Sequence, residues 1–209
     1  MSYVKICGLS QEAHVESAID AGADAVGFVL VESPRQIGVE RARALSRFAG
    51  ERVDRVAVFR ELTAAAIAMA LDAECTHLQA RGSYDAFATL ALTPLPVVLD
   101  GVTATSELDA LGPLGVPILF DGSHQGTGVL ASIDRAEALA RRARIVLAGG
   151  LHPANVAQII AQVRPVGVDV SSGVELRRGE KDAALIVDFV RAARAAFSSL
   201  SLSLEVPPC

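Results

Sequence analysis

The stretch Arg144–Gly173 has the sequence RIVLAGGLHPANVAQIIAQVRPVGVDVSSG and decides the fold of this chain. Residues 144–148 and 166–170 are short apolar runs rich in β-branched side chains, which indicates strands buried on both faces. Between them, apolar residues recur at helical spacing from 156 to 163, and Pro153 suits the first turn of a helix. The stretch therefore predicts two parallel strands joined by a helix.

Both strands of this unit are followed by small residues. Gly149 and Gly150 follow the first strand, and Ser171, Ser172 and Gly173 follow the second. Small residues let backbone N–H groups approach a ligand closely, and such amides favour a phosphate group. A pair of phosphate-binding loops after the last two strands is common in the eight-fold parallel barrel. We therefore expect a phosphate site here, although a pair of glycines can also be simply a tight turn.

Six further strand segments precede this unit, and each is followed by a helical segment, at a spacing of roughly 20–30 residues. The expected strands cover residues 3–7, 23–30, 53–59, 75–79, 96–99, 117–120, 144–148 and 166–170. The expected helices cover residues 11–21, 39–48, 63–71, 84–92, 103–111, 132–142, the segment from 153 and residues 181–197. Alternation of this kind predicts an α/β protein with a parallel sheet.

Eight repeats without a long insertion predict a single (β/α)8 TIM barrel over residues 1–197, followed by a polar tail, residues 198–209, that we expect to fray. The alternative fold is a doubly wound open sheet. Its usual G-x-G-x-x-G fingerprint after the first strand is absent, because Cys7-Gly-Leu-Ser10 stands in that place.

Composition narrows the class of protein. A chain of 209 residues is long enough for one such barrel, and its net charge of −5 with no basic block argues against nucleic acid as a partner. No apolar run is long enough to span a bilayer, so we expect no membrane association. The three cysteines, Cys7, Cys75 and Cys209, are too scattered for a disulfide framework or a zinc site, which favours a reducing, cytoplasmic location.

The catalytic groups of a barrel lie at the C-terminal ends of its strands. Read in order, these ends carry Cys7, Arg35, Gln79 with Arg81, Asp100, Asp121, the glycine pair and Asp169. Each also has a purely structural reading: a cysteine can be a small buried hydrophobe, and Asp121 before a glycine can be a turn residue. Asp169 interrupts an apolar strand, and a buried carboxylate needs a partner.

A thiol and a carboxyl that face each other across the ring of strand ends can act as a general base and a general acid. Cys7 could take a proton from carbon, and Asp121 could give one to an oxygen. Together with a phosphate site, this pair suggests the isomerisation of a phosphosugar. The residues alone go no further than that.

Several motifs resemble those of the phosphoribosylanthranilate isomerase family of tryptophan biosynthesis. The resemblance covers the barrel from end to end, and the combination is specific where no single motif is. The motifs are Lys5-Ile-Cys-Gly-Leu9, Ser33-Pro-Arg-Gln36, Leu119-Phe-Asp121 with Gly126-Thr-Gly128, Leu147-Ala-Gly-Gly-Leu151 with Pro153 and Asn155, and Val168-Asp-Val-Ser-Ser-Gly-Val-Glu175 with Gly179 and Lys181-Asp182.

This resemblance implies an Amadori rearrangement, in which Asp121 is the general acid and Cys7 is the general base. It also implies that Arg35 binds the anthranilate carboxylate, a task that suits its planar guanidinium, and that Asp169 orients the substrate. Gln79 is a further substrate-binding candidate. The phosphate ligands implied are Gly128, Gly149, Gly150, Ser171, Ser172 and Gly173. The partner is a small phosphosugar, no metal or organic cofactor is implied, and the assembly is left as a monomer or a homodimer.

The chain departs from the family pattern in a few places. Arg81 stands where the family has a His, Gln125 stands where it has a Gly, and the Phe-Asp-Trp segment that follows strand six in the family is missing. Two alternatives therefore stay open at this point. One is a related isomerase that acts on another phosphosugar, and the other is a phosphosugar-binding barrel without catalysis.

Overall fold

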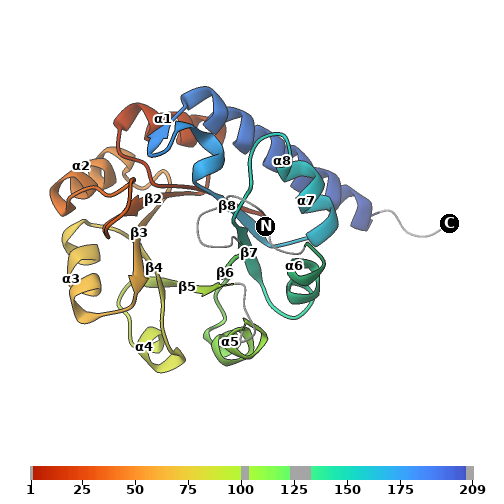
Figure 1. Ribbon diagram of the computed structural model, residues 1–209, viewed down its shortest axis with the longest axis horizontal. Coiled ribbons are helices and arrows are strands. Elements are labelled where there is room, and N and C mark those ends of the chain that lie inside the picture. The colour runs from red at the N-terminus through yellow and green to blue at the C-terminus, as the bar shows by residue number, and fades with distance from the viewer. Residues whose placement is uncertain (1, 100–103, 123–132, 206–209) are drawn as a thin grey trace.

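The computed structural model describes residues 2–99, 104–122 and 133–205, with side chains through residue 200. Its centre is a closed barrel of eight parallel strands (Figure 1). The strands are β1 (Tyr3–Cys7), β2 (Ala25–Val29), β3 (Asp54–Glu61), β4 (His77–Arg81), β5 (Thr93–Leu99), β6 (Ile118–Asp121), β7 (Ile145–Ala148) and β8 (Gly167–Val170). Each strand pairs with the next, and β8 pairs with β1. The predicted TIM barrel is therefore confirmed, and the open doubly wound sheet is excluded.

Helices follow the strands and form the outer layer of the barrel (Figure 1). They are α1 (Glu12–Ala21), α2 (Val39–Ala49), α3 (Ala64–Asp72), α4 (Tyr84–Ala88), α5 (Ala104–Leu111), α6 (Ile133–Ala140), α7 (Val156–Val163) and α8 (Ala183–Glu205). Two 3₁₀ turns, η1 (Gly112–Leu114) and η2 (Ser172–Val174), complete the set. In the described part of the chain, no helix combines the length and the apolar character needed to cross a membrane.

The last helix differs from its expected bounds at both ends. Expected over residues 181–197, it begins at Ala183 and continues to Glu205. Residues 198–205, expected to be part of a frayed tail, are therefore helical; they contain no Gly or Pro, and their leucines favour a helix. Residues 206–209 lie outside the described residues. The expected helix over 84–92 is also shorter than expected and ends at Ala88.

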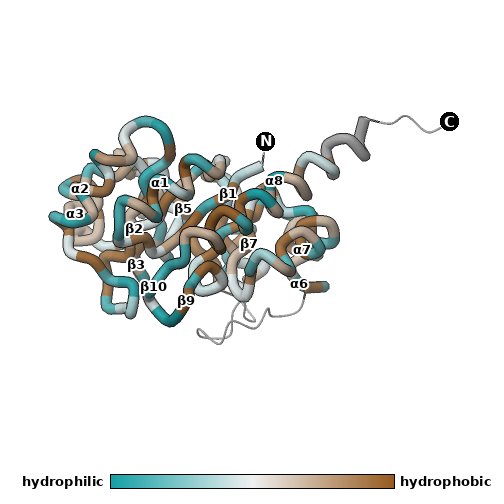
Figure 2. Tube along the Cα trace, turned by 90° about the horizontal axis from the view of Figure 1, so that it is seen from above, coloured by the Kyte–Doolittle hydropathy of each residue, from teal (hydrophilic) through white to brown (hydrophobic). Residues whose placement is uncertain are grey.

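A small antiparallel hairpin follows β8 and was not expected from the sequence. Its strands are β9 (Glu175–Arg177) and β10 (Glu180–Lys181), joined by a turn in which Gly179 has φ +85°. In Figure 2 the hairpin lies at the bottom of the molecule, at the end of the barrel opposite the start of β1. Its last residue, Lys181, is the first residue of the expected final helix.

The core has two layers because successive residues of a strand point to opposite faces. Val4 and Ile6 of β1 point outward and join the large cluster between the barrel and the helices. A second, smaller cluster fills the inside of the barrel and consists of Ala25, Val56, Leu95, Leu119 and Ala148. Lys5 and Asp169 are also buried. The interior of the barrel thus combines an apolar cluster with a buried charged pair.

The closure between β1 and β8 depends on the absence of a side chain at Gly167. A β-carbon at this position would lie 2.5 Å from the carbonyl oxygen of Tyr3 and 2.7 Å from its Cβ. We expect Gly167→Ala to lower the free energy of unfolding by about 1–3 kcal/mol, the usual cost of overpacking a core. Urea denaturation measures the change. Gly112→Ala is the control, because a β-carbon there meets no atom within 4 Å; equal stability of the two variants would contradict this account.

Candidate active site

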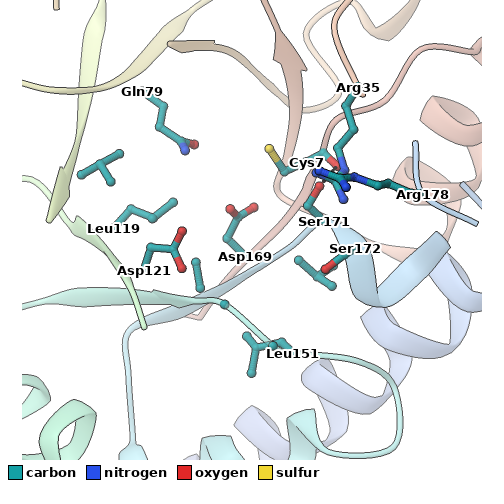
Figure 3. A pocket seen from close by; sticks show the side chains of 15 residues that line it. Cys7, Arg35, Gln79, Leu119, Asp121, Leu151, Asp169, Ser171, Ser172 and Arg178 are labelled. Carbon is teal, nitrogen blue, oxygen red and sulfur yellow. Dashed lines mark hydrogen bonds between the residues drawn. The ribbon is translucent and has the colours of Figure 1, made fainter. Parts of the chain in front are cut away.

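A pocket of about 280 Å³ opens at the C-terminal ends of the strands (Figure 3). Most of the site residues predicted from the sequence line it. They are Cys7, Arg35, Gln79, Asp121, Gly149, Gly150, Asp169, Ser171 and Ser172. Leu119 and Ala148 of the inner apolar cluster also line it. Side chains from β1, β4, β6 and β8 therefore meet in one cavity, as the barrel topology requires.

Some predicted residues lie elsewhere. Gly173 does not line the pocket, because it packs against the preceding loop: a β-carbon there would lie 1.8 Å from the carbonyl oxygen of Leu151. Arg81 does not line the pocket either, and it pairs with Glu61 at the end of β3. Gly128, together with Gln125 and Asp100, lies outside the described residues.

Cys7 lies beside a buried ion pair. The side chains of Tyr3, Lys5 and Cys7 alternate with the outward-facing residues of β1, and Lys5 is opposite Asp169 in the β1–β8 register. The Lys5 Nζ atom donates a hydrogen bond of 2.9 Å to Asp169 Oδ1, and the two side chains are 0% and 7% exposed. The buried carboxylate flagged in the sequence therefore has its partner, Lys5.

Gly27 leaves the space in which the thiol and the ammonium group meet. A β-carbon at this position of β2 would lie 3.1 Å from Cys7 Sγ and 3.1 Å from Lys5 Nζ. The two atoms are thus neighbours over the same glycine. Lys5 has three donor hydrogens, so it can hold Asp169 and still interact with the sulfur.

Burial and neighbouring charges shift the pKa values of the residues in this cluster. Burial raises the pKa of the Cys7 thiol, and the positive charges of Lys5 and Lys181 only partly oppose this effect. Burial also raises the pKa of Asp169, against the pull of Lys5. For Lys5, burial lowers the pKa, but Asp169 and Cys7 outweigh burial and the pKa is raised. Lys5 therefore stays charged, and it is the group that most favours a thiolate at Cys7.

Gln79 presents an unsatisfied group to the pocket. The residue is 8% exposed, and its Oε1 atom has no hydrogen-bond partner within the described residues. An unpaired buried amide oxygen costs about 1–3 kcal/mol, unless a ligand or water satisfies it. In Figure 3 the amide end points into the cavity, across from Asp121. This arrangement suits an acceptor for a substrate N–H or O–H group.

The loop after β7 has the backbone geometry of an anion site. Gly149 and Gly150 have φ values of +93° and +65°, a conformation that other residues rarely adopt. Asn155 holds the loop: its Nδ2 donates to the Gly150 carbonyl at 2.9 Å, and its Oδ1 accepts from the His152 amide at 2.8 Å. Pro153, expected in the first turn of α7, lies in the turn before it, since α7 begins only at Val156.

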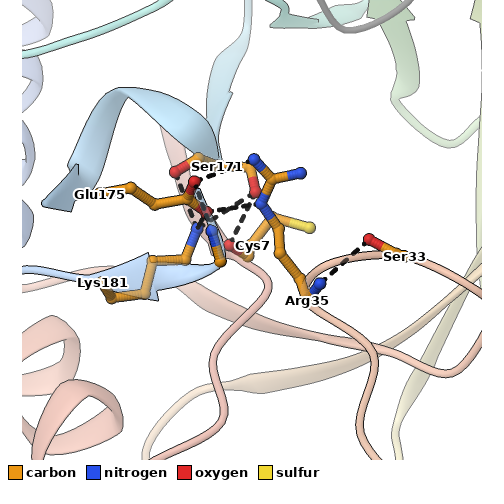
Figure 4. Close-up of polar contacts among 7 residues, drawn as sticks. Cys7, Ser33, Arg35, Ser171, Glu175 and Lys181 are labelled. Atoms are coloured by element: carbon orange, nitrogen blue, oxygen red, sulfur yellow. Dashed lines mark hydrogen bonds and ion pairs between the residues drawn. The ribbon is translucent and has the colours of Figure 1, made fainter. Parts of the chain in front are cut away.

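Arg35 is held by the hairpin that follows β8 (Figure 4). Its Nε and Nη2 atoms donate to Glu175 Oε1 and Oε2 at 2.5 Å and 3.0 Å, a side-on bidentate pair. Lys181 Nζ donates to the same Oε1 at 2.8 Å and to the carbonyl and hydroxyl oxygens of Ser171. Gly8 gives the Arg35 side chain room, because a β-carbon there would lie 2.8 Å from Arg35 Cδ.

These contacts leave one edge of the Arg35 guanidinium available. The side-on edge faces Glu175, whereas Nη1 has no partner within the described residues. The Ser171 hydroxyl, by contrast, is engaged, since it donates to the Cys7 carbonyl at 3.2 Å and accepts from Lys181. The exposed hydroxyl of Ser172 is better placed for a ligand.

Glu175 is ionised over a wide pH range. Burial alone raises its pKa, but the hydrogen bonds from Arg35, Lys181 and the Gly179 amide outweigh burial and lower the pKa to about 2. Burial lowers the pKa of Lys181, and Glu175 partly restores it. The hairpin thus contributes a fixed negative charge that anchors two cations at the edge of the pocket.

Four charged residues of the site have no role predicted from the sequence. Lys5 could have been found by the argument used for Asp169, because it also interrupts an apolar strand. Glu175, Arg178 and Lys181 lie in a short polar segment without periodicity, and nothing local to that segment marks it as part of the site. In the described part of the chain, no group of three or more His, Cys, Asp or Glu side chains is arranged to hold a metal ion.

Comparison with known protein families gives a match over most of the chain. Residues 4–192 match the model of the family described as N-(5′-phosphoribosyl)anthranilate (PRA) isomerase. A protein of this name from Roseiflexus castenholzii is 40% identical over 209 residues, which covers 92% of this chain and 98% of that protein. A second, from Citrifermentans bemidjiense, is 39% identical and covers 87% of this chain and 92% of that protein.

Solved structures agree with this match. The phosphoribosylanthranilate isomerase of Thermotoga maritima superimposes with a TM-score of 0.81 at 32% identity, covering 93% of this chain and all of that one. An isomerase in complex with reduced 1-(o-carboxyphenylamino)-1-deoxyribulose 5-phosphate gives 0.79 at 33% identity, with the same coverage. A third structure, of monomers generated from the dimeric T. maritima enzyme, gives 0.79 at 29% identity and covers 93% of this chain and all of that one.

The low pKa of Glu175 predicts a pH-dependent contribution to stability. Because the folded pKa of about 2 lies below the ordinary value of 4.5, the stabilisation by ionised Glu175 is complete above about pH 4.5 and is lost as the pH falls toward 2. We expect Glu175→Gln to lower the unfolding free energy at pH 7 by about 2–4 kcal/mol, and the difference from the wild type to shrink below pH 4.5.

Urea denaturation at several pH values measures this difference. Glu180→Gln is the matched control, because Glu180 pairs with the exposed Arg177 and such surface pairs contribute less than about 1 kcal/mol. A loss in Glu175→Gln that is the same at pH 7 and pH 3 would contradict the assignment.

Proposed function

The chain belongs to the N-(5′-phosphoribosyl)anthranilate isomerase family, and we propose from this how its own residues carry out the family's reaction. It is an isomerase that converts N-(5′-phosphoribosyl)anthranilate to 1-(2-carboxyphenylamino)-1-deoxyribulose 5-phosphate in tryptophan biosynthesis. The reaction is an Amadori rearrangement, which opens a furanose ring and moves a proton from C2′ to C1′. It therefore needs one group that gives a proton to oxygen and one that takes a proton from carbon.

We assign the proton donor to Asp121 and the proton acceptor to Cys7. Asp121 donates to the ring oxygen O4′, the C1′–O4′ bond breaks, and the glycosylamine becomes an open-chain Schiff base. Cys7 then removes the C2′ proton, and the electron pair of that C–H bond forms the C1′=C2′ bond of an enolamine. Tautomerisation places a proton on C1′ and leaves the ketone at C2′. The observation that carries this assignment is that a thiol on β1 and a carboxyl on β6 line one pocket.

We further assign Lys5 and Asp169 to the support of the base. A thiol acts as a base only as a thiolate, and burial works against that form at Cys7. Lys5 offsets this effect with a positive charge next to the sulfur, and its hydrogen bond to Asp169 fixes the ammonium group in place. In this proposal Asp169 acts mainly through Lys5, rather than by orienting the substrate alone.

The two anionic ends of the substrate are assigned to different groups of residues at the rim of the pocket. The loops after β7 and β8, with Gly149, Gly150 and Ser172, hold the phosphate through backbone amides and the exposed Ser172 hydroxyl. Arg35 holds the aromatic carboxylate on the edge that Glu175 leaves available. Gln79 accepts a hydrogen bond from the substrate with its unpaired Oε1.

Two broader alternatives were open from the sequence, a related isomerase with another substrate and a barrel without catalysis. No described residue favours either of them over the family's reaction. For assembly we propose a monomer or a homodimer, in line with the dimer and monomers described for T. maritima. We also keep the cytoplasm as the proposed compartment, since Cys7 and Cys75 are both free thiols.

Replacing the proposed base tests the first assignment. We expect Cys7→Ser to lower kcat by at least about 10²-fold, because a serine hydroxyl is a far weaker base than a thiolate at neutral pH. Turnover is followed as the loss of phosphoribosylanthranilate fluorescence. Cys75→Ser is the matched control, since Cys75 is buried beside Ser46 outside the pocket. Normal turnover by Cys7→Ser would show that another group is the base.

Replacing the proposed acid separates catalysis from binding. Asp121→Asn keeps the shape of the side chain but removes the transferable proton. We expect kcat to fall by about 10²–10⁴-fold, while the affinity for the reduced product analogue stays near that of the wild type. Steady-state kinetics and calorimetric titration measure the two effects. Asp109→Asn, which alters a surface pair with Arg142, controls for the loss of charge. An unchanged kcat in Asp121→Asn would remove this residue from the mechanism.

A further inference from the structure

The wall of the pocket that carries Arg35 holds more positive than negative charge. Arg35 and Lys181 both bind Glu175, so one carboxylate serves two cations. Arg178, at the turn of the hairpin, lines the same pocket. Within the described residues Arg178 forms no ion pair or hydrogen bond, so its charge is not compensated. Three cations thus face a single carboxylate at this wall.

The position of Arg178 is set by a direct contact between two loops. Gly179 packs against the loop that carries Arg35: a β-carbon on Gly179 would lie 2.6 Å from the carbonyl oxygen of Pro34. The Gly179 amide also donates to Glu175 Oε2 at 3.1 Å. Arg178 and Arg35 are each adjacent in sequence to a residue of this contact. Figure 3 accordingly shows both side chains entering the pocket from the same side.

The bonding of Arg35 leaves it an incomplete site for a carboxylate. Glu175 occupies its side-on edge and places a negative charge beside it. A carboxylate ligand can bind the Nη1 end of the guanidinium. The positive charge that it meets there is already partly neutralised by Glu175. A second, uncompensated cation beside such a site strengthens the binding of an anion. Arg178 is the charged residue on this wall that can supply one.

We propose that Arg178 is a specificity-determining residue that binds the aromatic carboxylate of the substrate together with Arg35. This inference rests on the proposed function, because it takes the carboxylate at the Arg35 wall as given. The phosphate is assigned instead to Gly149, Gly150 and Ser172. Arg178 therefore separates substrates that carry a carboxylate on the amine's aromatic ring from those that do not.

The test compares two ligands that differ only in that carboxylate. One is reduced 1-(2-carboxyphenylamino)-1-deoxyribulose 5-phosphate, and the other is the corresponding phenylamino compound without the carboxyl group. Isothermal titration calorimetry measures the Kd of both ligands for the wild type, Arg178→Ala and Arg178→Lys. Arg177→Ala is the matched control, since Arg177 is the neighbouring arginine, carries the same charge, pairs with Glu180 and does not line the pocket.

We expect Arg178→Ala to weaken binding of the carboxylate ligand by about tenfold, and to change the affinity for the phenylamino compound by less than about twofold. Arg178→Lys should recover part of the loss, and Arg177→Ala should change neither affinity. Binding, not turnover, is measured, so the result does not depend on the roles given to Cys7 and Asp121.

Three outcomes would overturn the proposal in different ways. If the wild type binds the two ligands equally well, no carboxylate site exists, and the proposed function of the Arg35 wall fails with it. If the wild type prefers the carboxylate ligand and Arg178→Ala keeps that preference, only the role of Arg178 fails. If Arg178→Ala weakens both ligands equally, the residue acts on the phosphate or sugar instead.

Discussion

The buried ion pair between Lys5 and Asp169 is the interaction on which the rest of this structure depends. It joins β1 to β8, and its carboxylate lines the pocket. Removing one partner of such a pair typically costs about 3–5 kcal/mol, whereas a well-packed apolar pair in its place is often no less stable. Stability alone therefore does not explain why a charged pair occupies this position. The Cys7 thiol offers an explanation, because the Lys5 ammonium group lies next to its sulfur.

The rim of the pocket is held together by contacts in which one partner lacks a side chain. Gly8 lies under Arg35, Gly173 packs on the Leu151 carbonyl, and Gly179 packs on the Pro34 carbonyl. Each contact joins two loops that follow different strands. Side chains on these loops are thereby positioned by backbone packing as well as by their own hydrogen bonds. This matters for a site whose ligand has an anionic group at each end, because the two walls must keep a fixed separation.

The fold was predictable because its signals are local. Residues 144–148 and 166–170 are apolar runs of strand length, and the helix between them repeats its apolar residues at the helical period. Cys7, Asp121 and Asp169 were found as candidates because strand ends in a parallel barrel meet at one rim. The hairpin was not predictable in this way. Its key contact joins Glu175 to Arg35, 140 residues away, and nothing in the segment from 175 to 181 specifies that partner. Lys5 interrupts an apolar strand as Asp169 does, so the sequence marks both as buried charges, but it does not show that they are each other's partner.

The 164 residues that separate Lys5 from Asp169 have a consequence for how the protein is made. During synthesis on the ribosome, the first strand emerges with a lysine in the middle of an apolar segment, and no carboxylate partner for it exists until the eighth strand has left the exit tunnel. Contacts of such long sequence separation form late and slow the folding of a chain. A nascent chain that lacks the last strand can form helices and neighbouring strand pairs, but it cannot close the barrel. The thiol and the cation held beside it therefore reach their final arrangement only after the eighth strand has been synthesised.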